Sequence, residues 1–284
     1  MNIRRSDPQV FSFEFFPPKT PNGQNNLRTT RQQLAGLHPH FFSVTFGAGG
    51  STQSGTLETV IETQRETGIQ TAPHISCIGS TREKIRQILD SYLDAGIRRL
   101  VALRGDLPAG MTEAGEFRYA NELVEFIRAE TADAFHIEVA AYPEVHPEAP
   151  SAKADLENFK RKVQAGANSA ITQYFYDVDA YLGFVENCQR IGVQVPIIPG
   201  IMPITNYASL ANFSQRCGAK IPRPLAERLE GFGDDLAGLQ AYGIDVVTEL
   251  CRRLLEAGAP GLHFYALNRA EPSVTIWKNL DLPS

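Results

Sequence analysis

The chain has 284 residues and a formal net charge of −5, and 43% of its residues are hydrophobic against 21% charged. This composition excludes general disorder, and an acidic balance argues against a nucleic-acid-binding surface. No apolar run approaches the roughly 18 residues that span a bilayer, and no stretch of signal-peptide type precedes Pro8. We therefore expect a cytoplasmic protein without a membrane or nucleic-acid partner.

One pattern recurs along the chain: a polar stretch with helical periodicity ends in glycine, and an apolar stretch rich in strand formers follows at once. Such a glycine suits the left-handed residue that ends many helices, and the pattern is typical of the helix-to-strand loop of a βαβ unit. The helix-ending glycines are Gly36, Gly68, Gly96, Gly166, Gly192 and Gly258. The predicted strands are 11–16, 40–46, 70–76, 98–104, 135–141, 168–175, 195–200 and 261–266.

Each of these eight strands precedes a helix-like stretch, and the last interval holds an additional helical segment near 222–231. Eight βα units in a chain of this length predict a (β/α)8 TIM barrel. No linker divides the sequence, so we expect a single domain over 1–284. The alternative is a doubly wound sheet, which normally has a glycine-rich turn after its first strand, but the first strand here ends in FFPPKT.

The cysteines and histidines form no recognisable motif. Cys77, Cys188, Cys217 and Cys251 do not stand at CxxC spacing, which argues against a zinc ribbon and a redox dithiol. HExxH, GxxxxGK[ST] and GxSxG are absent as well. Their absence argues against a metalloprotease, a P-loop NTPase and an α/β-hydrolase.

Polar side chains gather where the predicted strands end, which is the end of a barrel where catalysis takes place. They are Glu14, Thr45, His74, Arg104, Asp106, Tyr142, His146, Gln173 and Arg269. Because side chains alternate along a strand, Phe13 and Phe15 suit the helix layer and Glu14 faces the barrel mouth. A carboxyl group among aromatic neighbours is desolvated, so we expect its pKa to be raised toward that of a general acid.

Each candidate also has a plainer interpretation. Glu14 could be a structural residue paired with an arginine, and Asp106 an ordinary turn or helix-cap residue. Asp155 and Lys162 share a helix face and could be a solvated pair, and Phe213 could serve packing alone. His74 and His146, with Asp106 and Glu14, could instead bind a metal ion, as in a metal-dependent barrel aldolase or hydrolase.

Several long segments nonetheless resemble one family. They are SFEFFPPKT (12–20), SVTFGAGGST (43–52), APHISCI (72–78), VALRGDLP (101–108), the stretch from AAYPEVHPEA to ITQYFYD (140–177), IIPGIMP (197–203) and HFYALNRAE (263–271). Together they resemble the methylenetetrahydrofolate reductase family of the bacterial type, whose fold is a barrel and whose cofactor is FAD. The resemblance spans nearly the whole chain, and it implies no metal.

The resemblance implies a role for each matching residue. FAD would contact Thr45, His74, Arg104, Gly105, Asp106, Tyr119, Ala120, Tyr142, His146, Glu148, Ala149, Asp155, Asn158 and Lys162. Substrate would contact Thr45, Asp106, Gln173, Phe213 and Arg269, and Glu14 and Asp106 would be catalytic. The substrates implied are methylenetetrahydrofolate and NADH or NADPH, and the assembly implied is a homo-oligomer.

The mechanism that the resemblance implies has two half-reactions on one flavin. NADH or NADPH reduces FAD and leaves, and methylenetetrahydrofolate then takes its place. Glu14 donates a proton toward N10 as the folate ring opens, and hydride transfer gives 5-methyltetrahydrofolate, the methyl source for methionine. Gly49 and Gly50 depart from the small polar pair of close bacterial members. The sequence has only 13 residues before Glu14 and 15 after Arg269, so we expect no regulatory domain of the kind that the eukaryotic enzymes have.

Overall fold

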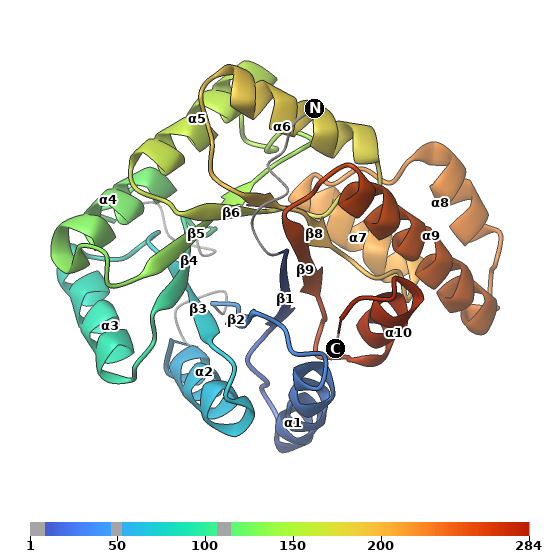
Figure 1. The fold of residues 1–284 in the computed structure, drawn as a ribbon, viewed down its shortest axis with the longest axis horizontal. Coiled ribbons are helices and arrows are strands. Elements are labelled where there is room, and N and C mark those ends of the chain that lie inside the picture. Colours follow the sequence, from blue (N-terminus) through green and yellow to red (C-terminus); the bar gives the residue numbers. More distant parts are fainter. Residues whose placement is uncertain (1–8, 47–52, 107–114, 284) are drawn as a thin grey trace.

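The structure, a computed structural model, describes residues 9–46, 53–106 and 115–283, so Gly49 and Gly50 lie outside the described residues. Its strands are β1 (Val10–Phe15), β2 (Phe41–Val44), β3 (Thr71–Ser76), β4 (Arg99–Leu103), β5 (His136–Ala141), β6 (Ser169–Thr172), β7 (Ile197–Ile198), β8 (Gly200–Ile201) and β9 (Gly261–Tyr265). They pair in the order β7-β6-β5-β4-β3-β2-β1-β9-β8, and every pair is parallel. Helices surround the strands (Figure 1), which confirms the TIM-barrel-like fold.

The barrel closes through a strand that the sequence predicted to be continuous over 195–200. The structure divides it at Pro199, because β7 pairs with β6 whereas β8 pairs with β9. Proline has no backbone N–H to donate to a neighbouring strand, but the Pro199 carbonyl accepts from the His263 N–H at 3.0 Å. The predicted strand therefore serves as two short strands, one for each neighbour.

Gly200 lies at this closure because no side chain fits there. A Cβ atom on Gly200 would lie 2.2 Å from the Thr172 carbonyl oxygen and 2.7 Å from the Tyr265 ring. Tyr265 crosses above the glycine and donates its hydroxyl hydrogen bond to the Thr172 carbonyl at 2.7 Å. This contact ties β9 to β6 across the two-residue strands.

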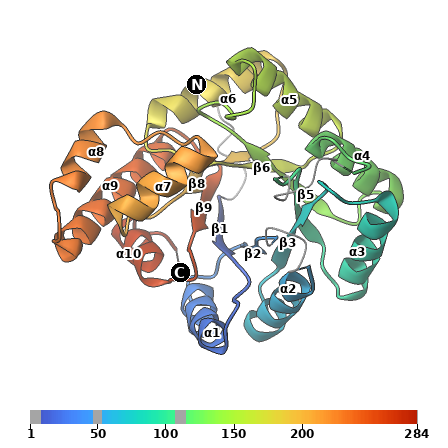
Figure 2. The same cartoon turned by 180° about the vertical axis from the view of Figure 1, so that it is seen from behind.

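The helices are α1 (Pro21–Ala35), α2 (Gln53–Thr67), α3 (Arg82–Asp94), α4 (Ala120–Thr131), α5 (Ala152–Gln164), α6 (Val178–Arg190), α7 (Tyr207–Cys217), α8 (Arg223–Glu230), α9 (Leu236–Glu256) and α10 (Glu271–Asn279). The additional helix predicted near 222–231 is α8, and α7, α8 and α9 occupy one sector between β8 and β9 (Figure 2). None of the described helices is long and apolar enough to cross a membrane.

The predicted helix-ending glycines are confirmed at all but one position. Gly68, Gly96, Gly166, Gly192 and Gly258 have positive φ angles, as a left-handed helix end requires. Gly36 differs: its φ is −64°, and the left-handed residue is His38, two positions later, with φ 49°. The left-handed residue between α1 and β2 thus lies two residues beyond the predicted glycine.

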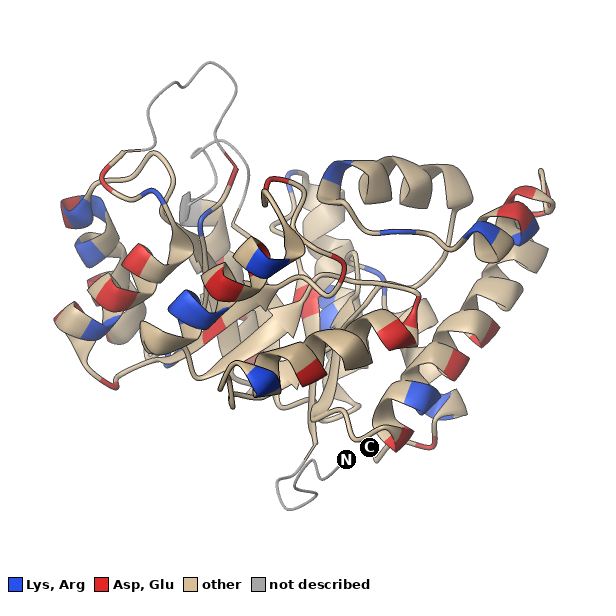
Figure 3. Ribbon diagram, turned by 90° about the horizontal axis from the view of Figure 1, so that it is seen from above, with Lys and Arg blue, Asp and Glu red and all other residues tan. Residues whose placement is uncertain are grey.

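The main core lies between the strands and the outer helices. Phe13 points outward from β1, stacks on Phe264 at 5.3 Å, and packs against Trp277 of α10 at 5.7 Å between ring centroids. A second buried cluster, formed by Phe41, Ala72, Val101 and Ile171, fills the barrel interior. The charged residues are mostly on the outer helices and the loops (Figure 3), so the few on the strands need separate explanations.

Candidate active site

A cavity of about 780 Å³ opens at the carboxyl ends of the strands. Of the predicted site residues, its lining includes Glu14, Thr45, His74, Gly105, Asp106, Tyr142, Gln173 and Phe213. Val101, Leu103 and Ile171 supply apolar wall between them. A largely apolar cavity of this size with a few convergent polar groups is typical of a small-molecule site.

Glu14 lies in this cavity because β1 alternates its side chains. Phe13 and Phe15 are buried on the helix side, which leaves Glu14 on the inner face, as the sequence predicts. The Glu14 Oε2 atom lies 3.1 Å from His74 Nε2 on β3 and 3.3 Å from His263 Nε2 on β9. The Ser43 hydroxyl donates to the same oxygen at 3.4 Å.

The prediction of a raised pKa for Glu14 is wrong. Burial by itself raises the pKa of this carboxyl group, as expected, but attraction to His74 and hydrogen bonds from His263 and His74 outweigh burial and lower the pKa to about 2. Desolvation of one strand position can be inferred from SFEFF alone. The two imidazoles come from neighbouring strands, β3 and β9, and only the folded barrel brings them to the same oxygen.

His263 is a site residue that the sequence analysis missed. Its ring is fully buried, its Nδ1 lies 2.7 Å from the Ser12 hydroxyl, and its ring stacks on Phe41 at 6.0 Å. The alternation of strand 261–266 contained the signal, because it places His263 on the same inner face as Tyr265. The sequence analysis considered only the end of that strand.

Gln173 and Phe213 both line the cavity, Gln173 from the end of β6 and Phe213 from α7. Gln173 directly follows β6, and its N–H continues the ladder by donating to the Ala141 carbonyl at 2.8 Å. Phe213 on α7 is 39% exposed and stacks on Tyr174 with ring centroids 5.9 Å apart. Its ring is therefore both packed and accessible from the cavity.

A second group of predicted residues lies beside the cavity. Arg104 pairs with Glu148 at 2.6 Å, and the Glu148 N–H donates to His146 Nδ1 at 3.1 Å. The His146 ring lies 4.5 Å from that of Tyr142, which lines the cavity. The loop after β5 is thus joined to the end of β4 by charge and hydrogen bonding.

Helix α5 directs Asp155 and Lys162 toward this loop and the sheet rather than into solvent. Asp155 Oδ2 accepts from the His146 N–H at 2.8 Å, and the Lys162 ammonium donates to the Ala140 carbonyl. Burial lowers the pKa of Lys162 to about 8, against the attraction of Asp155. The pair is not the solvated pair of the plainer interpretation.

The remaining predicted residues do not line the cavity. Tyr119 precedes α4 and is 58% exposed, with Ala120 as the first residue of that helix. The Ala149 N–H donates to the His146 carbonyl at 2.9 Å, and Asn158 accepts from Arg161 at 3.1 Å. Arg269 is exposed in the loop after β9.

A metal-dependent site would need Glu14, His74, Asp106 and His146 around one ion. His146 packs against Tyr142, whereas His74 lies beside Glu14. In the three described ranges, no group of three or more His, Cys, Asp or Glu side chains is placed to hold a metal ion.

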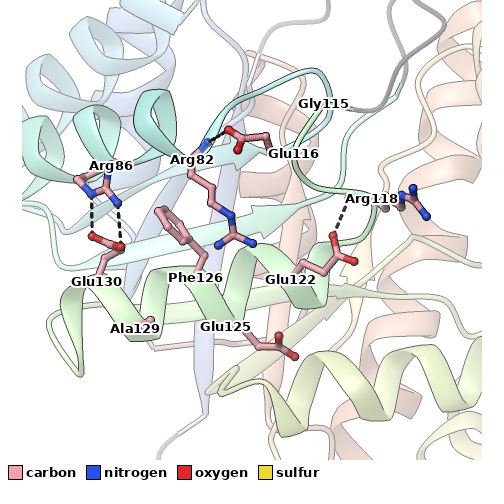
Figure 4. Close-up of a pocket in the computed structure, with 10 residues that line it drawn as sticks. All are labelled: Arg82, Arg86, Gly115, Glu116, Arg118, Glu122, Glu125, Phe126, Ala129 and Glu130. Carbon is pink, nitrogen blue, oxygen red and sulfur yellow. Dashed lines mark hydrogen bonds and ion pairs between the residues drawn. The ribbon is translucent and has the colours of Figure 1, made fainter.

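A second hollow of similar volume, about 810 Å³, lies outside the barrel, between α3 and α4 (Figure 4). Its charged side chains largely satisfy one another: Arg86 pairs with Glu130 at 2.8 Å, and Glu116 accepts from the Arg82 N–H at 2.7 Å. It is away from the strand ends, so the barrel cavity is the better candidate for chemistry.

The fold and the cavity define the class of protein: a parallel α/β-barrel enzyme with a carboxylate–imidazole centre at its strand ends. Residues 1–281 match the family model described as methylenetetrahydrofolate reductase. Over 269 residues, the chain is 44% identical to the 5,10-methylenetetrahydrofolate reductase of Escherichia coli (strain K12), covering 95% of this chain and 90% of that protein. The chain belongs to the methylenetetrahydrofolate reductase family.

Two other relatives show the range of this similarity. The chain is 42% identical over 286 residues to the "Probable methylenetetrahydrofolate reductase (NADH)" of Oryza sativa subsp. japonica, covering 96% of this chain and 48% of that protein. An uncharacterized protein from Clostridium thermocellum that binds two copies of 5-methyl-5,6,7,8-tetrahydrofolic acid has the same fold. The TM-score is 0.67, with 17% identity, 97% of this chain covered and 95% of that one.

Proposed function

We propose that the protein reduces 5,10-methylenetetrahydrofolate to 5-methyltetrahydrofolate, with NADH or NADPH as the reductant and FAD as the bound cofactor. The observation that carries the proposal is that Glu14, Asp106 and Gln173, the family's set for this chemistry, line one cavity of about 780 Å³. Family membership over residues 1–281 supports the same activity. The net reaction consumes one NAD(P)H and one proton for each methyl group formed.

The residues in and beside the cavity have the chemistry that a flavin cofactor needs. The apolar cavity wall suits a planar ring, and two cations lie against it: Arg104 precedes the lining residue Gly105, and Lys162 donates to the carbonyl of the lining residue Ala140. Cations of this kind suit phosphate oxygens. Bound FAD would supply a hydride carrier, held by the residues that the family resemblance names.

In the proposed reaction, Glu14 delivers a proton to N10 of the folate as the bond between N10 and the methylene carbon breaks. A carboxyl group with a pKa of about 2 holds no proton at neutral pH, so we propose that Glu14 passes a proton on rather than storing one. His74 and His263, at 3.1 and 3.3 Å from Oε2, are the groups from which it can be taken. The proton leaves the nitrogen of a protonated imidazole, crosses Oε2 and ends on N10, and the neutral imidazole then regains a proton from solvent.

The other residues bind and orient. Gln173 offers both a donor and an acceptor to a pterin edge, and the exposed Phe213 ring can stack on a planar substrate. Asp106 places a negative charge at the ring site, which favours a more strongly reducing cofactor. Arg269 is the proposed partner for the folate beyond the cavity lining. We further propose a cytoplasmic homo-oligomer, which sedimentation of the purified protein would test.

A colour-and-turnover experiment tests the function. Purified protein should be yellow, with flavin absorption bands. Under anaerobic conditions NADH or NADPH alone should reduce only the bound flavin, one equivalent per site, and continued oxidation of NADH or NADPH should require 5,10-methylenetetrahydrofolate. Because one cavity must serve both substrates, double-reciprocal plots should give parallel lines. Colourless protein with stoichiometric zinc or manganese would favour the metal-dependent alternative, and intersecting lines would contradict the shared site.

A further inference from the structure

The cavity lining is unbalanced in charge. It contains two carboxylates, Glu14 and Asp106, and Lys84 is the sole lysine or arginine among the described residues that line it. Lys84 is exposed, and no described carboxylate lies within ion-pair distance of its ammonium group. Both substrates of the proposed reaction are anions, so the position of this single cation bears on how they bind.

The backbone at Lys84 is held firmly beside the cavity. Ser80 in the loop before α3 donates to the Cys77 carbonyl at 3.0 Å and accepts from the Glu116 N–H at 3.1 Å. Ser80 and Gly115 also form a parallel bridge. Gly115 has φ 80°, and a Cβ atom there would lie 2.8 Å from the Ser80 carbonyl oxygen, so this close approach requires glycine. The start of α3 is therefore preorganised.

The first turn of α3 sends its charged side chains in two directions. Arg82 lies over the rings of Phe117 and Phe126 at 5.2 and 5.3 Å, in the outer hollow shown in Figure 4. Glu83 pairs with Arg86 at 2.7 Å. Lys84, two residues beyond Arg82 and so on the other side of the helix, reaches the cavity instead.

The helix gains nothing from a cation at this position. Lys84 lies in the first turn, where the helix dipole disfavours positive charge. The turn is already capped, because Thr81 Oγ1 accepts from the Lys84 N–H at 3.2 Å and Glu116 accepts from the Arg82 N–H at 2.7 Å. A lysine that opposes the dipole, pairs with no described carboxylate and faces a substrate cavity is placed for an external anion.

We propose that Lys84 is a substrate-binding residue that holds an anionic group remote from the reacting rings. The inference rests on the proposed function and deepens it. The chemistry recognised is an oxyanion: either a phosphate of the nicotinamide dinucleotide or a carboxylate of the glutamate part of folate. The ammonium acts as a point charge, which also offsets the repulsion of these anions by Glu14 and Asp106.

The test compares Lys84→Met and Lys84→Arg with Lys278→Met in the FAD-loaded enzyme. Lys278 is exposed in the last turn of α10 and is outside the cavity lining, so its variant controls for lost charge. Lys84→Met should raise the KM and the Kd of one substrate about three- to tenfold with little change in kcat, as expected of an exposed ion pair. Lys84→Arg should stay near wild type, and high salt should reduce the difference.

The substrate affected identifies the anion. A change for NADH or NADPH assigns Lys84 to the dinucleotide phosphates, and a change for methylenetetrahydrofolate assigns it to the glutamate carboxylates. Unchanged constants for both substrates in an active enzyme would overturn the inference alone. Loss of FAD from Lys84→Met would also overturn it, because Lys84 would then serve the cofactor. If the wild-type protein were inactive and bound neither substrate, both the proposed function and this inference would be wrong.

Discussion

Two buried glutamates face the interior of the barrel, and their partners differ. Glu14 lies at the cavity, where two imidazoles and a hydroxyl surround one oxygen. Glu138 lies deeper, on the same face of β5 as the cavity-lining Ala140, and is fully buried. It pairs with Arg99, lies 3.3 Å from His136 Nε2, and accepts from the Ser169 hydroxyl at 2.5 Å.

The difference shows which carboxylate is available for chemistry. Burial raises the pKa of Glu138, but the hydrogen bond from His136 and the attraction of Arg99 lower it overall. An arginine does not give up its proton in a protein, so Glu138 stays a carboxylate in a closed cluster. Glu14 has two imidazoles and one hydroxyl as partners, with no arginine among them, and it lines the cavity. The structural interpretation weighed for Glu14, a pairing with arginine, describes Glu138.

The largest expected effect is on Glu14 chemistry. In Glu14→Gln the FAD content and the reduction of the flavin by NADH or NADPH should persist, whereas folate reduction should fall by about 10²–10⁴-fold, the usual cost of losing a proton-transfer group. Stopped-flow measurement of the two half-reactions checks this. Equal slowing of both would contradict the proton-transfer role.

The same substitution at Glu138 should lower the stability of the fold and leave catalysis intact. Glu138→Gln removes the carboxylate that pairs with Arg99, although Arg99 keeps its hydrogen bond to Gln70 at 3.1 Å. The free energy of unfolding should therefore fall by about 3 kcal/mol, the upper end for a hydrogen bond to a charged group. Urea unfolding followed by circular dichroism measures it. The folded protein should keep both half-reactions. If Glu138→Gln lost folate reduction but kept wild-type stability, the assignment of Glu138 to stability and Glu14 to catalysis would be wrong.

Lys162 is a third buried charge, and it opposes folding. Its pKa is lowered to about 8 from 10.5, so at neutral pH the folded state carries a burial cost on the order of 3 kcal/mol. Because the unfolded chain binds this proton more tightly, the cost diminishes as pH rises from about 8 toward 10.5 and is absent above that.

The corresponding variant is Lys162→Met. Protein stripped of FAD should be more stable than wild type at pH 7, with the difference shrinking as pH rises through that window, and FAD should bind more weakly. Urea unfolding at several pH values and flavin titration measure the two effects. A variant less stable than wild type at pH 7 would contradict the burial argument.

The smallest expected effect is on folate binding by the Gln173 variant. Gln173→Ala should weaken folate binding by about 1–3 kcal/mol, because polar groups of the substrate would lose their partner. FAD content should stay at the wild-type level, since the proposed flavin contacts lie elsewhere. Equilibrium binding of folate to the variant measures the change, and an unaltered dissociation constant would remove Gln173 from the substrate site.

Local patterns predicted most of the fold and the place of the site. Alternation in SFEFF was enough to direct Glu14 inward, and glycine-ended helices marked the βα units. The break at Pro199 was not predictable, because it depends on which neighbour each half-strand pairs with. The sign of the Glu14 pKa shift was missed for a related reason: strand register pairs Glu14 with Ser43 and Tyr265, and only that register brings His74 and His263 to one oxygen.

The closure at Gly200 also constrains protein engineering. A library that randomises residues 197–201, which contain β7 and β8, includes a position where even a methyl group would lie 2.2 Å from the Thr172 carbonyl oxygen. The connection from β8 to β9 follows immediately. It contains α7, α8 and α9, and part of it lies on the outside of the barrel. New loops and grafted sequences therefore belong in the connection from β8 to β9, while residue 200 stays fixed as the point on which the closed shape of the barrel depends.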